Sequence, residues 1–267
     1  MQAGNSAPIG VIDSGVGGLS VLKCLRERLP RENFLYLGDT ARTPYGSRSE
    51  AEIRAFVEEM LLWLERQNVK LAVIACNTLT MLGIESLQRE HPFPLVGMSK
   101  GAKLLLAEGK RKRVAVFATA FTVGTGAHEQ AVLAEDPAAK FLAVACPKYV
   151  PLIEGERFAS PEMRAAVAEY AEQIKAFGAE ALLLGCTHYP FIRAEIEAAL
   201  EGVAVIDPAE ETADKAAAVL AVKDLATDAC AGSVTVCCTA DVERVKRLTS
   251  AMMPGIACDF REISLQR

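Results

Sequence analysis

The sequence is poor in aromatic residues and has no long hydrophobic run. Aromatic side chains make up 6% of the 267 residues, although hydrophobic residues as a whole make up 51%. The core must therefore be built mainly from alanine, valine, isoleucine and leucine, which suits helices packed on a parallel sheet. No apolar run reaches the roughly 18 residues of a membrane-spanning helix. Residues 1–7 contain no apolar signal region either, so we expect a cytoplasmic protein that does not contact a membrane.

Basic residues are also in the minority. Lysine and arginine number 29 against 34 aspartates and glutamates, which gives a net charge of −5. Binding to phosphates requires a basic face, so nucleic acid is excluded as the main partner. The single basic run, residues 110–113, precedes an apolar stretch, and we interpret it as a solvated helix end.

Patterns that would indicate a metal site or a disulfide framework are missing. The three histidines (91, 128 and 188) are far apart in the sequence, and no two cysteines form a C-x-x-C pair. We therefore expect no metal ion. Eight cysteines in a chain of this length without an export signal are expected to be reduced thiols.

What the sequence does contain is a pair of similar segments, residues 71–78 and 181–190. Each begins as a short aliphatic run typical of a buried strand and ends in a cysteine followed by hydrogen-bonding side chains. Cys76 is followed by Asn77 and Thr78, and Cys186 by Thr187 and His188. The carboxyl ends of strands are where ligands bind in open α/β sheets. A following helix N-terminus, here starting near Pro190, would stabilise a thiolate.

Two further loops follow predicted strands. Residues 8–12 form the first expected strand and lead into a glycine-rich loop headed by Asp13. The loop lacks the G-x-G-x-x-G pattern, and a carboxylate there would repel a pyrophosphate but would suit an ammonium group or proton transfer. The alternative is that Asp13 only caps the helix over residues 19–29. The second loop, residues 38–47, is long enough to indicate a function.

Strands and helices are predicted to alternate along the chain in two runs. At 267 residues two domains are plausible. No Ser/Pro-rich linker separates the runs, so we expect two domains to be joined by short crossings, and we expect the last segment to return to the first domain. Expected helices include one with a capping box at Ser49 and Glu52, one from Cys76 to about residue 90, and one that begins at Ser160 and ends at Gly178. A loop with several threonines is expected after the strand over residues 113–117.

The number of active cysteines decides between two chemistries. One active cysteine would indicate a hydrolase or acyl transferase, with His188 as its base. Two cysteines on opposite sides of a substrate would instead remove an α-proton from one face and deliver a proton to the other, which is racemisation. A lone cysteine is usually a small buried hydrophobe, but two in matching surroundings favour a function.

At this point the chain resembles the cofactor-independent glutamate racemases over nearly its whole length. The resemblance is carried by residues 13–18, by Asp39 through Gly46, by residues 75–78, by Cys146-Pro147 with Val150-Pro151 and Glu154, and by residues 185–190. It implies an α/β protein of two flavodoxin-like, doubly wound parallel-sheet domains, related by a pseudo-twofold, with the active site between them. The implied first domain comprises residues 1–98 plus 208–267 and carries Cys76, and the second comprises residues 99–207 and carries Cys186.

The resemblance also implies roles for individual residues. Cys76 and Cys186 are the implied acid/base pair, assisted by Asp13, Glu154 and His188. The implied substrate-binding residues are Asp13, Ser14, Pro44, Tyr45, Gly46, Asn77, Thr78, Thr119, Thr122, Thr187 and His188. The implied protein is a homodimeric isomerase that needs no cofactor or metal and converts L-glutamate to D-glutamate for peptidoglycan synthesis, and so for cell-wall biogenesis and cell shape.

Two segments depart from the family pattern. Met98-Ser99-Lys100 stands where an acidic residue and a proline are common, and His128 replaces a tyrosine after Thr119, Thr122 and Thr125. The nearest alternative is an aspartate racemase of the same family. Decarboxylases and maleate isomerases of this fold, a single-cysteine hydrolase and a binding protein on a retained racemase fold are the others. The Tyr45 loop and the two complete cysteine segments favour the glutamate enzyme over the decarboxylases and isomerases, and the paired cysteines argue against a binding protein. The sequence alone argues only weakly against aspartate as the substrate.

Overall fold

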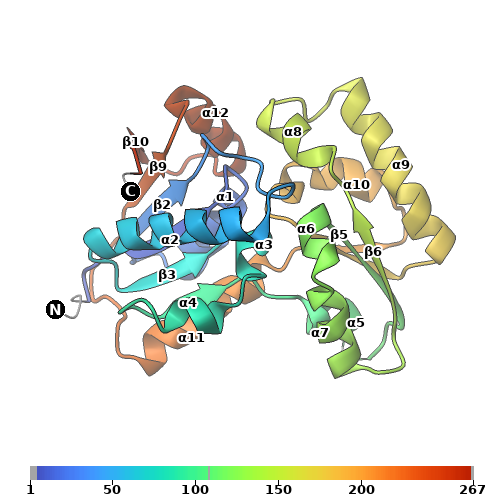
Figure 1. Cartoon of the computed structure of the whole chain (residues 1–267), viewed down its shortest axis with the longest axis horizontal. Helices are drawn as coiled ribbons and strands as arrows, with labels where there is room; N and C mark the ends of the chain where they lie inside the picture. Colours follow the sequence, from blue (N-terminus) through green and yellow to red (C-terminus); the bar gives the residue numbers. More distant parts are fainter. Residues whose placement is uncertain (1–4, 108, 266–267) are drawn as a thin grey trace. The chain divides into compact units, whose positions relative to one another are not determined.

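The computed structural model describes residues 5–107 and 109–265. The chain divides into two compact units, each described by itself below. Unit 1 comprises Met1–Met98 and Ala209–Arg267, and unit 2 comprises Ser99–Pro208. The C-terminal segment therefore belongs with the N-terminal one (Figure 1).

The described residues of unit 1 form a six-stranded sheet in which every pairing is parallel. In spatial order the strands are β10 (Asp259–Glu262), β9 (Val234–Cys238), β2 (Phe34–Gly38), β1 (Ile9–Asp13), β3 (Leu71–Ile74) and β4 (Leu95–Gly97). All residues of β1, β2 and β3 are buried. These strands are continuous apolar runs because helices cover both faces of a parallel sheet.

The helices of unit 1 come from both ends of the chain. They are α1 (Leu19–Arg28), α2 (Glu50–Arg66), α3 (Asn77–Thr80), α4 (Ile84–Gln88), α11 (Ala209–Val222) and α12 (Val242–Met252). The predicted capping box opens α2: the Ser49 side chain accepts from the Glu52 N–H while the Glu52 carboxylate accepts from the Ser49 N–H. Helix α2 crosses in front of the sheet in Figure 1, and α1 packs against α11 and α12.

The described residues of unit 2 form a four-stranded parallel sheet. Its strands are, in spatial order, β6 (Lys140–Ala145), β5 (Arg113–Ala118), β7 (Ala181–Gly185) and β8 (Ala204–Ile206). The helices are α5 (Ala102–Leu106), α6 (Ala120–Gly124), α7 (Ala127–Glu135), α8 (Tyr149–Glu154), α9 (Pro161–Phe177), the 3₁₀ helix η1 (Tyr189–Ile192) and α10 (Arg193–Ala199). As predicted, Ser160 caps α9 and Gly178, in the left-handed conformation, ends it.

Side chains alternate between two separate cores on the faces of this sheet. Along β7, Leu182 and Leu184 join one core, and Ala181 and Leu183 join the other. This is the period of two expected of a strand. The first core also contains Cys186, so the cysteine lies over the face covered by α8, α9 and α10.

Both units share one strand order. Numbered within each unit, four strands are arranged 2-1-3-4, the flavodoxin-like order, and β9 and β10 extend the sheet of unit 1 beyond β2. The chain reverses its direction across the sheet between β1 and β3 and again between β5 and β7. These are the switch points at which such sheets bind ligands. The predicted fold class, an α/β protein of two parallel-sheet domains, is confirmed.

Several local predictions are wrong. The helix expected from Cys76 to residue 90 is broken into α3 and α4, because Gly83 adopts a left-handed φ of 94° between them. The threonine loop after β5 contains the short helix α6. The basic run differs only in part from its interpretation as a helix end: residues 110–113 pass from a turn into β5, but Arg111 donates to the carbonyls of Leu104 and Leu105 at the end of α5. Strand β10 was not expected, because its sequence is mostly polar and it is a largely exposed edge strand.

None of the helices in the described ranges is long and apolar enough to cross a bilayer.

Candidate active site

Cys76 lies at the switch point of unit 1. It follows β3, occupies the N-cap of α3 and is 4% exposed. Its Sγ atom is 3.5 Å from Oγ of Ser14, which follows β1. The two residues meet because β1 and β3 are parallel neighbours, so their carboxyl ends lie side by side.

Asp13 is fully buried at the end of β1. Its Oδ1 accepts the Gly15 N–H at 2.8 Å. The N-cap of α1 is Gly18, so Asp13 does not occupy the capping position, and the alternative interpretation of this residue as a helix cap is wrong. A buried carboxylate next to Ser14, and hence near Cys76, is placed to receive an ammonium group or a proton.

Asn77 provides a second polar group at this turn. Its side chain is buried, at 2% exposure, and within the described part of the chain neither its Oδ1 nor its Nδ2 atom has a hydrogen-bond partner. Buried amides are normally paired, so the Asn77 side chain is available to hydrogen-bond a ligand. Thr78, the next residue, is also buried.

The predicted substrate segment, residues 44–46, is anchored to the rest of unit 1 through Tyr45. Tyr45 is 1% exposed and its hydroxyl donates to Oδ2 of Asp39, a fully buried carboxylate. Burial and the neighbouring Asp39 charge raise the pKa of Tyr45 far above its usual value. The Thr43–Pro44 peptide bond is cis. The hydroxyl of Tyr45 is therefore already committed to a protein carboxylate.

In unit 2, Cys186 is the first member of a chain of three buried groups. Nδ1 of His188 lies 3.8 Å from Sγ of Cys186, and Nε2 of His188 lies 2.7 Å from Oε1 of Glu154 on α8. Burial by itself lowers the pKa of His188, but the contacts with Cys186 and Glu154 raise it, and the net pKa is well above the usual 6.5. A protonated His188 beside the sulfur stabilises a thiolate.

The predicted threonines lie at the same edge of the sheet of unit 2. Thr119 follows β5, the neighbour of β7, and caps α6 by accepting the Thr122 N–H at 3.3 Å. The Thr119 hydroxyl donates to Oγ1 of Thr122 at 3.0 Å. Thr187 is 5% exposed and directly follows Cys186. His128, the departure from the family pattern, is buried on α7, with Nδ1 3.2 Å from the Lys100 carbonyl.

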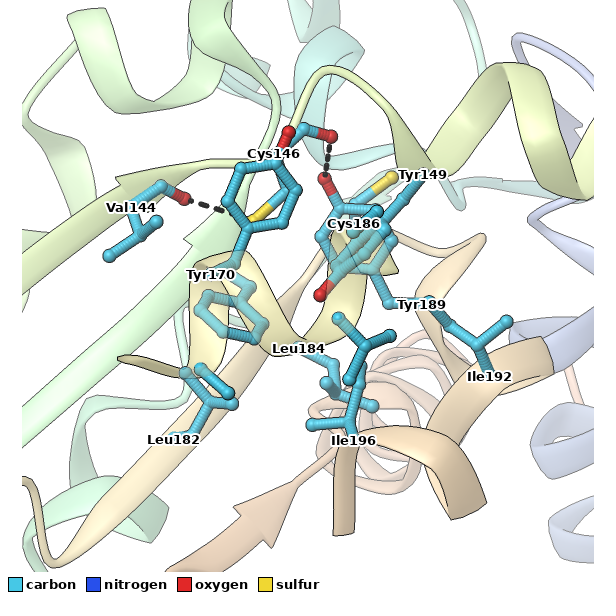
Figure 2. Packing of buried hydrophobic residues seen from close by; sticks show 14 of the residues in the cluster. Val144, Cys146, Tyr149, Tyr170, Leu182, Leu184, Cys186, Tyr189, Ile192 and Ile196 are labelled. Carbon is cyan, nitrogen blue, oxygen red and sulfur yellow. Dashed lines mark hydrogen bonds between the residues drawn. The ribbon is translucent and has the colours of Figure 1, made fainter. Parts of the chain in front are cut away.

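Three tyrosines, Tyr149, Tyr170 and Tyr189, share a buried core with Cys186 (Figure 2). The Tyr189 hydroxyl donates to the Cys146 carbonyl at 3.4 Å, and the Tyr189 ring meets Tyr149 edge-on with centroids 5.1 Å apart. Cys146 is 1% exposed, and burial, more than the neighbouring Cys186, raises the pKa of its thiol. The turn that carries Cys186 and His188 therefore packs on a buried cluster of aromatic rings.

The surroundings of Cys186 differ from the prediction in one respect. The helix after it begins as the 3₁₀ helix η1 at Tyr189, and the α-helix begins only at Arg193, so Cys186 is not at an α-helix N-terminus. Gly185 is the last residue of β7. A β-carbon there would lie 2.6 Å from Cγ2 of Val116, so close packing between neighbouring strands requires the glycine.

Asp39 and Tyr189 are the residues whose contacts the sequence reasoning missed. Asp39 follows β2 directly, as Asp13 ends β1, and this position at a strand's carboxyl end was the available signal. A cavity of about 510 Å³ in unit 1 is lined by Asp39, Arg42 and Thr239 and by residues 262–265. It includes none of the predicted substrate residues, so the chemistry of the two cysteine turns, and not this cavity, marks the candidate site.

No group of three or more potential ligands among the described residues is arranged to hold a metal ion.

Comparison with known proteins points to one family. The family model for Asp/Glu/hydantoin racemase matches residues 9–216. The glutamate racemase of Lysinibacillus sphaericus (strain C3-41) is 45% identical over 218 residues, which cover 81% of this chain and 82% of that protein.

Solved structures agree. The glutamate racemase isoform RacE1 from Bacillus anthracis is 30% identical with a TM-score of 0.90, and 98% of each chain is covered. The glutamate racemase of Francisella tularensis in complex with D-glutamate is 28% identical with a TM-score of 0.88 and the same coverage. On sequence, fold and the paired cysteine turns together, the chain belongs to the aspartate/glutamate/hydantoin racemase family and is an isomerase.

Proposed function

We propose that this protein is a glutamate racemase that uses Cys76 and Cys186 as its two acid/base groups. The observation that carries the proposal is the repetition of one site: each unit places a buried cysteine after its third strand, beside the end of its first strand. Relatives that are 45% identical and named glutamate racemases support glutamate as the substrate. The aspartate racemase homologue from Pyrococcus horikoshii is 17% identical and resembles this chain in fold alone.

The reaction requires one thiolate and one thiol. The thiolate takes the α-proton of glutamate as the Cα–H bond breaks, and the opposite thiol donates its proton to the other face of the carbanionic carbon. The product is the other enantiomer, and the protonation states of the two cysteines are exchanged. Both sulfur atoms must therefore reach the same α-carbon, one from each side.

In unit 2, His188 and Glu154 control the charge at Cys186. Glu154 holds Nε2 of His188, so the ring keeps its Nδ1 edge toward the sulfur. The raised pKa of His188 keeps the imidazolium populated at neutral pH, and its positive charge stabilises the Cys186 thiolate. When Cys186 acts as the acid, His188 stabilises the thiolate that remains.

In unit 1, Ser14 and Asp13 stand in the corresponding place. The Ser14 hydroxyl is within hydrogen-bond reach of the Cys76 sulfur and stabilises a thiolate when it donates to it. Asp13 attracts the substrate ammonium group. The unpaired Asn77 amide, with Thr78 and Thr187, offers donors for the substrate carboxylates. Because the proposed reaction uses no cofactor, these donors must also stabilise the negative charge that develops on the substrate as the α-proton leaves.

The proposal extends to the cell. We infer a cytoplasmic homodimer that supplies D-glutamate for peptidoglycan synthesis. Growth of a D-glutamate auxotroph on expression of this chain, without added D-glutamate, would support that role, and sedimentation analysis would establish the oligomeric state.

The direct test is proton NMR of the purified protein with L-glutamate in D₂O, followed by circular dichroism of the same sample. We expect the α-proton signal to disappear while the optical activity decays to zero. The same experiment with L-aspartate is the specificity control. Exchange of aspartate alone would make the protein an aspartate racemase, and exchange of neither under reducing conditions would contradict the proposed activity.

A further inference from the structure

Three hydrogen bonds from two separate parts of unit 1 converge on the fully buried carboxylate of Asp39. Its Oδ2 accepts from the Tyr45 hydroxyl and from Nε of Arg42, and its Oδ1 accepts from the Thr239 hydroxyl at 2.9 Å. The Asp39 backbone N–H donates to the Asp13 carbonyl at 3.0 Å, which joins this carboxylate to the strand that leads to Ser14. Hydrogen bonds to a buried charge are among the strong ones in proteins.

Arg42 links the same carboxylate to α2. Its Nη1 donates to Oε2 of Glu59 at 2.6 Å, and its guanidinium lies 4.0 Å from the ring centroid of Phe56. Phe56 also packs against the Tyr45 ring at a centroid distance of 5.1 Å. The side chains of residues 42 and 45 are thus held between Asp39 and one face of α2.

Thr239 links the carboxylate to the segment after β9. The Thr239 hydroxyl also accepts the Ala41 N–H at 2.9 Å. The Thr40 hydroxyl donates to the Ala240 carbonyl at 2.6 Å and accepts the Ala240 N–H at 2.9 Å. The start of the loop is therefore fastened to a segment 200 residues away in the sequence.

We propose that Asp39 is a positioning residue that holds residues 44–46 in the conformation that binds the substrate. The Tyr45 hydroxyl is committed to Asp39, so Tyr45 contributes by anchoring the segment and not by offering its hydroxyl to the substrate. This inference rests on the proposed function, because it assumes that residues 44–46 contact the amino acid.

The test replaces the carboxylate with an amide. In Asp39→Asn one of the two acceptor oxygens becomes an NH₂ group, so the donors that converge on it can no longer all be satisfied. We expect KM for glutamate to rise about 10- to 100-fold, the size of one lost charged hydrogen bond. The kcat is expected to change less than about threefold, since the lost interaction is made equally in ground state and transition state.

Glu32→Gln is the matched control. Glu32 is another buried carboxylate of unit 1, paired with Lys70 at 2.6 Å, and its Oε1 accepts the Thr227 N–H. It precedes β2, whereas Asp39 follows β2, so the two substitutions are chemically alike at opposite ends of one strand. Both are expected to lower the melting temperature, but Glu32→Gln should leave KM unchanged. Equal changes of KM in the two variants would overturn the inference.

A double-mutant cycle with Tyr45→Phe tests whether Asp39 acts on residues 44–46 through Tyr45 or whether its replacement disturbs the fold in general. If Asp39 acts through Tyr45, the double variant raises KM no further than Asp39→Asn alone, because both changes remove the same hydrogen bond. If the two substitutions instead raised KM independently, so that their fold-changes multiplied in the double variant, the inference would be overturned. If Asp39→Asn does not fold, Tyr45→Phe alone decides, and an unchanged KM in that variant would reject the proposal.

The wild-type protein distinguishes this inference from the proposed function. If it racemises glutamate while Asp39→Asn keeps its KM, only the role of Asp39 is wrong. A wild-type protein that exchanges neither glutamate nor aspartate overturns the proposed activity and, with it, this role for Asp39.

Discussion

At the scale of the residue, the two cysteines occupy equivalent positions but have different neighbours. Cys76 faces the Ser14 hydroxyl, whereas Cys186 faces the His188 imidazole, which Glu154 holds. A hydroxyl stabilises a thiolate by a hydrogen bond alone, but an imidazolium adds a full positive charge. The activities of variants at these two positions are therefore expected to depend on pH in different ways.

Replacing either of the two proposed acid/base thiols by a hydroxyl should strongly reduce racemisation. Cys76→Ser and Cys186→Ser are each expected to lower kcat by about 10²- to 10⁴-fold, the contribution of a positioned acid or base. Cys237→Ser is the control, because Cys237 is equally buried within β9. Circular dichroism assays of D-glutamate formation measure all three. A Cys76→Ser variant that retains near-normal turnover would favour a single-cysteine enzyme.

The His188–Glu154 pair should set a pH limit on activity. The proposed mechanism needs protonated His188, so activity is lost as the pH rises through its raised pKa. Glu154→Gln removes one cause of that shift and is expected to move the alkaline limb of the kcat/KM profile to lower pH. A limb that does not move would show that another group titrates there.

The His188–Glu154 pair should also stabilise the folded protein more at low pH than at high pH. Because the pKa of His188 is raised on folding, the pair stabilises the folded state fully below about pH 6.5 and loses this contribution as the pH rises through the raised value. Glu154→Gln should therefore lower the urea midpoint more at pH 6 than at a pH above the raised pKa of His188. A pH-independent loss would mean that packing alone is affected.

At the scale of the element, the ends of parallel strands bring the polar residues together. Gly185 makes this possible in β7, since a side chain there would collide with the neighbouring strand β5. The glycine thus lets β7 pack closely against β5, the strand that Thr119 follows.

Adding one methyl group tests this packing. Gly185→Ala places a β-carbon 2.9 Å from the Phe117 carbonyl oxygen as well as against Val116, so β7 must shift. We expect a loss of about 1–3 kcal/mol in the free energy of unfolding and a lower kcat, measured by urea denaturation and by racemisation. Gly124→Ala is the control, because a β-carbon there meets no atom within 4 Å. Equal stability of both variants would contradict the packing argument.

At the scale of the whole molecule, one unit is continuous in sequence and the other is not. In unit 1 the central strand β2 pairs with β9, and α1 packs against α11, so the N-terminal segment depends on the C-terminal one. All four described strands of unit 2 come from residues 99–208.

Fragments should reveal this difference. The fragment 99–208 is expected to fold alone, with a cooperative thermal transition by circular dichroism. The fragment 1–98 should not, because the edge of β2 and one side of α1 lose their partners. Adding the fragment 209–267 to it should restore structure. Independent folding of 1–98 would show that β9 and α11 are dispensable.

Most elements could be predicted from local patterns. The aliphatic run at residues 181–184 and the capping box at Ser49 carry their own structural signals, and both prediction and structure agree there. Strand β10 carries no such signal. Its pattern is polar, and only pairing with β9 makes it a strand.

The sequence by itself determined the alternation of strands and helices, the two cysteine segments and the family, because these depend on residues close together in the chain. Only the tertiary structure decided which distant side chains meet. Ser14 reaches Cys76, Glu154 reaches His188 and Thr239 reaches Asp39 across 62, 34 and 200 residues. These contacts depend on the order of the strands in each sheet, and strand order is decided by long-range pairing, which no local pattern of residues encodes.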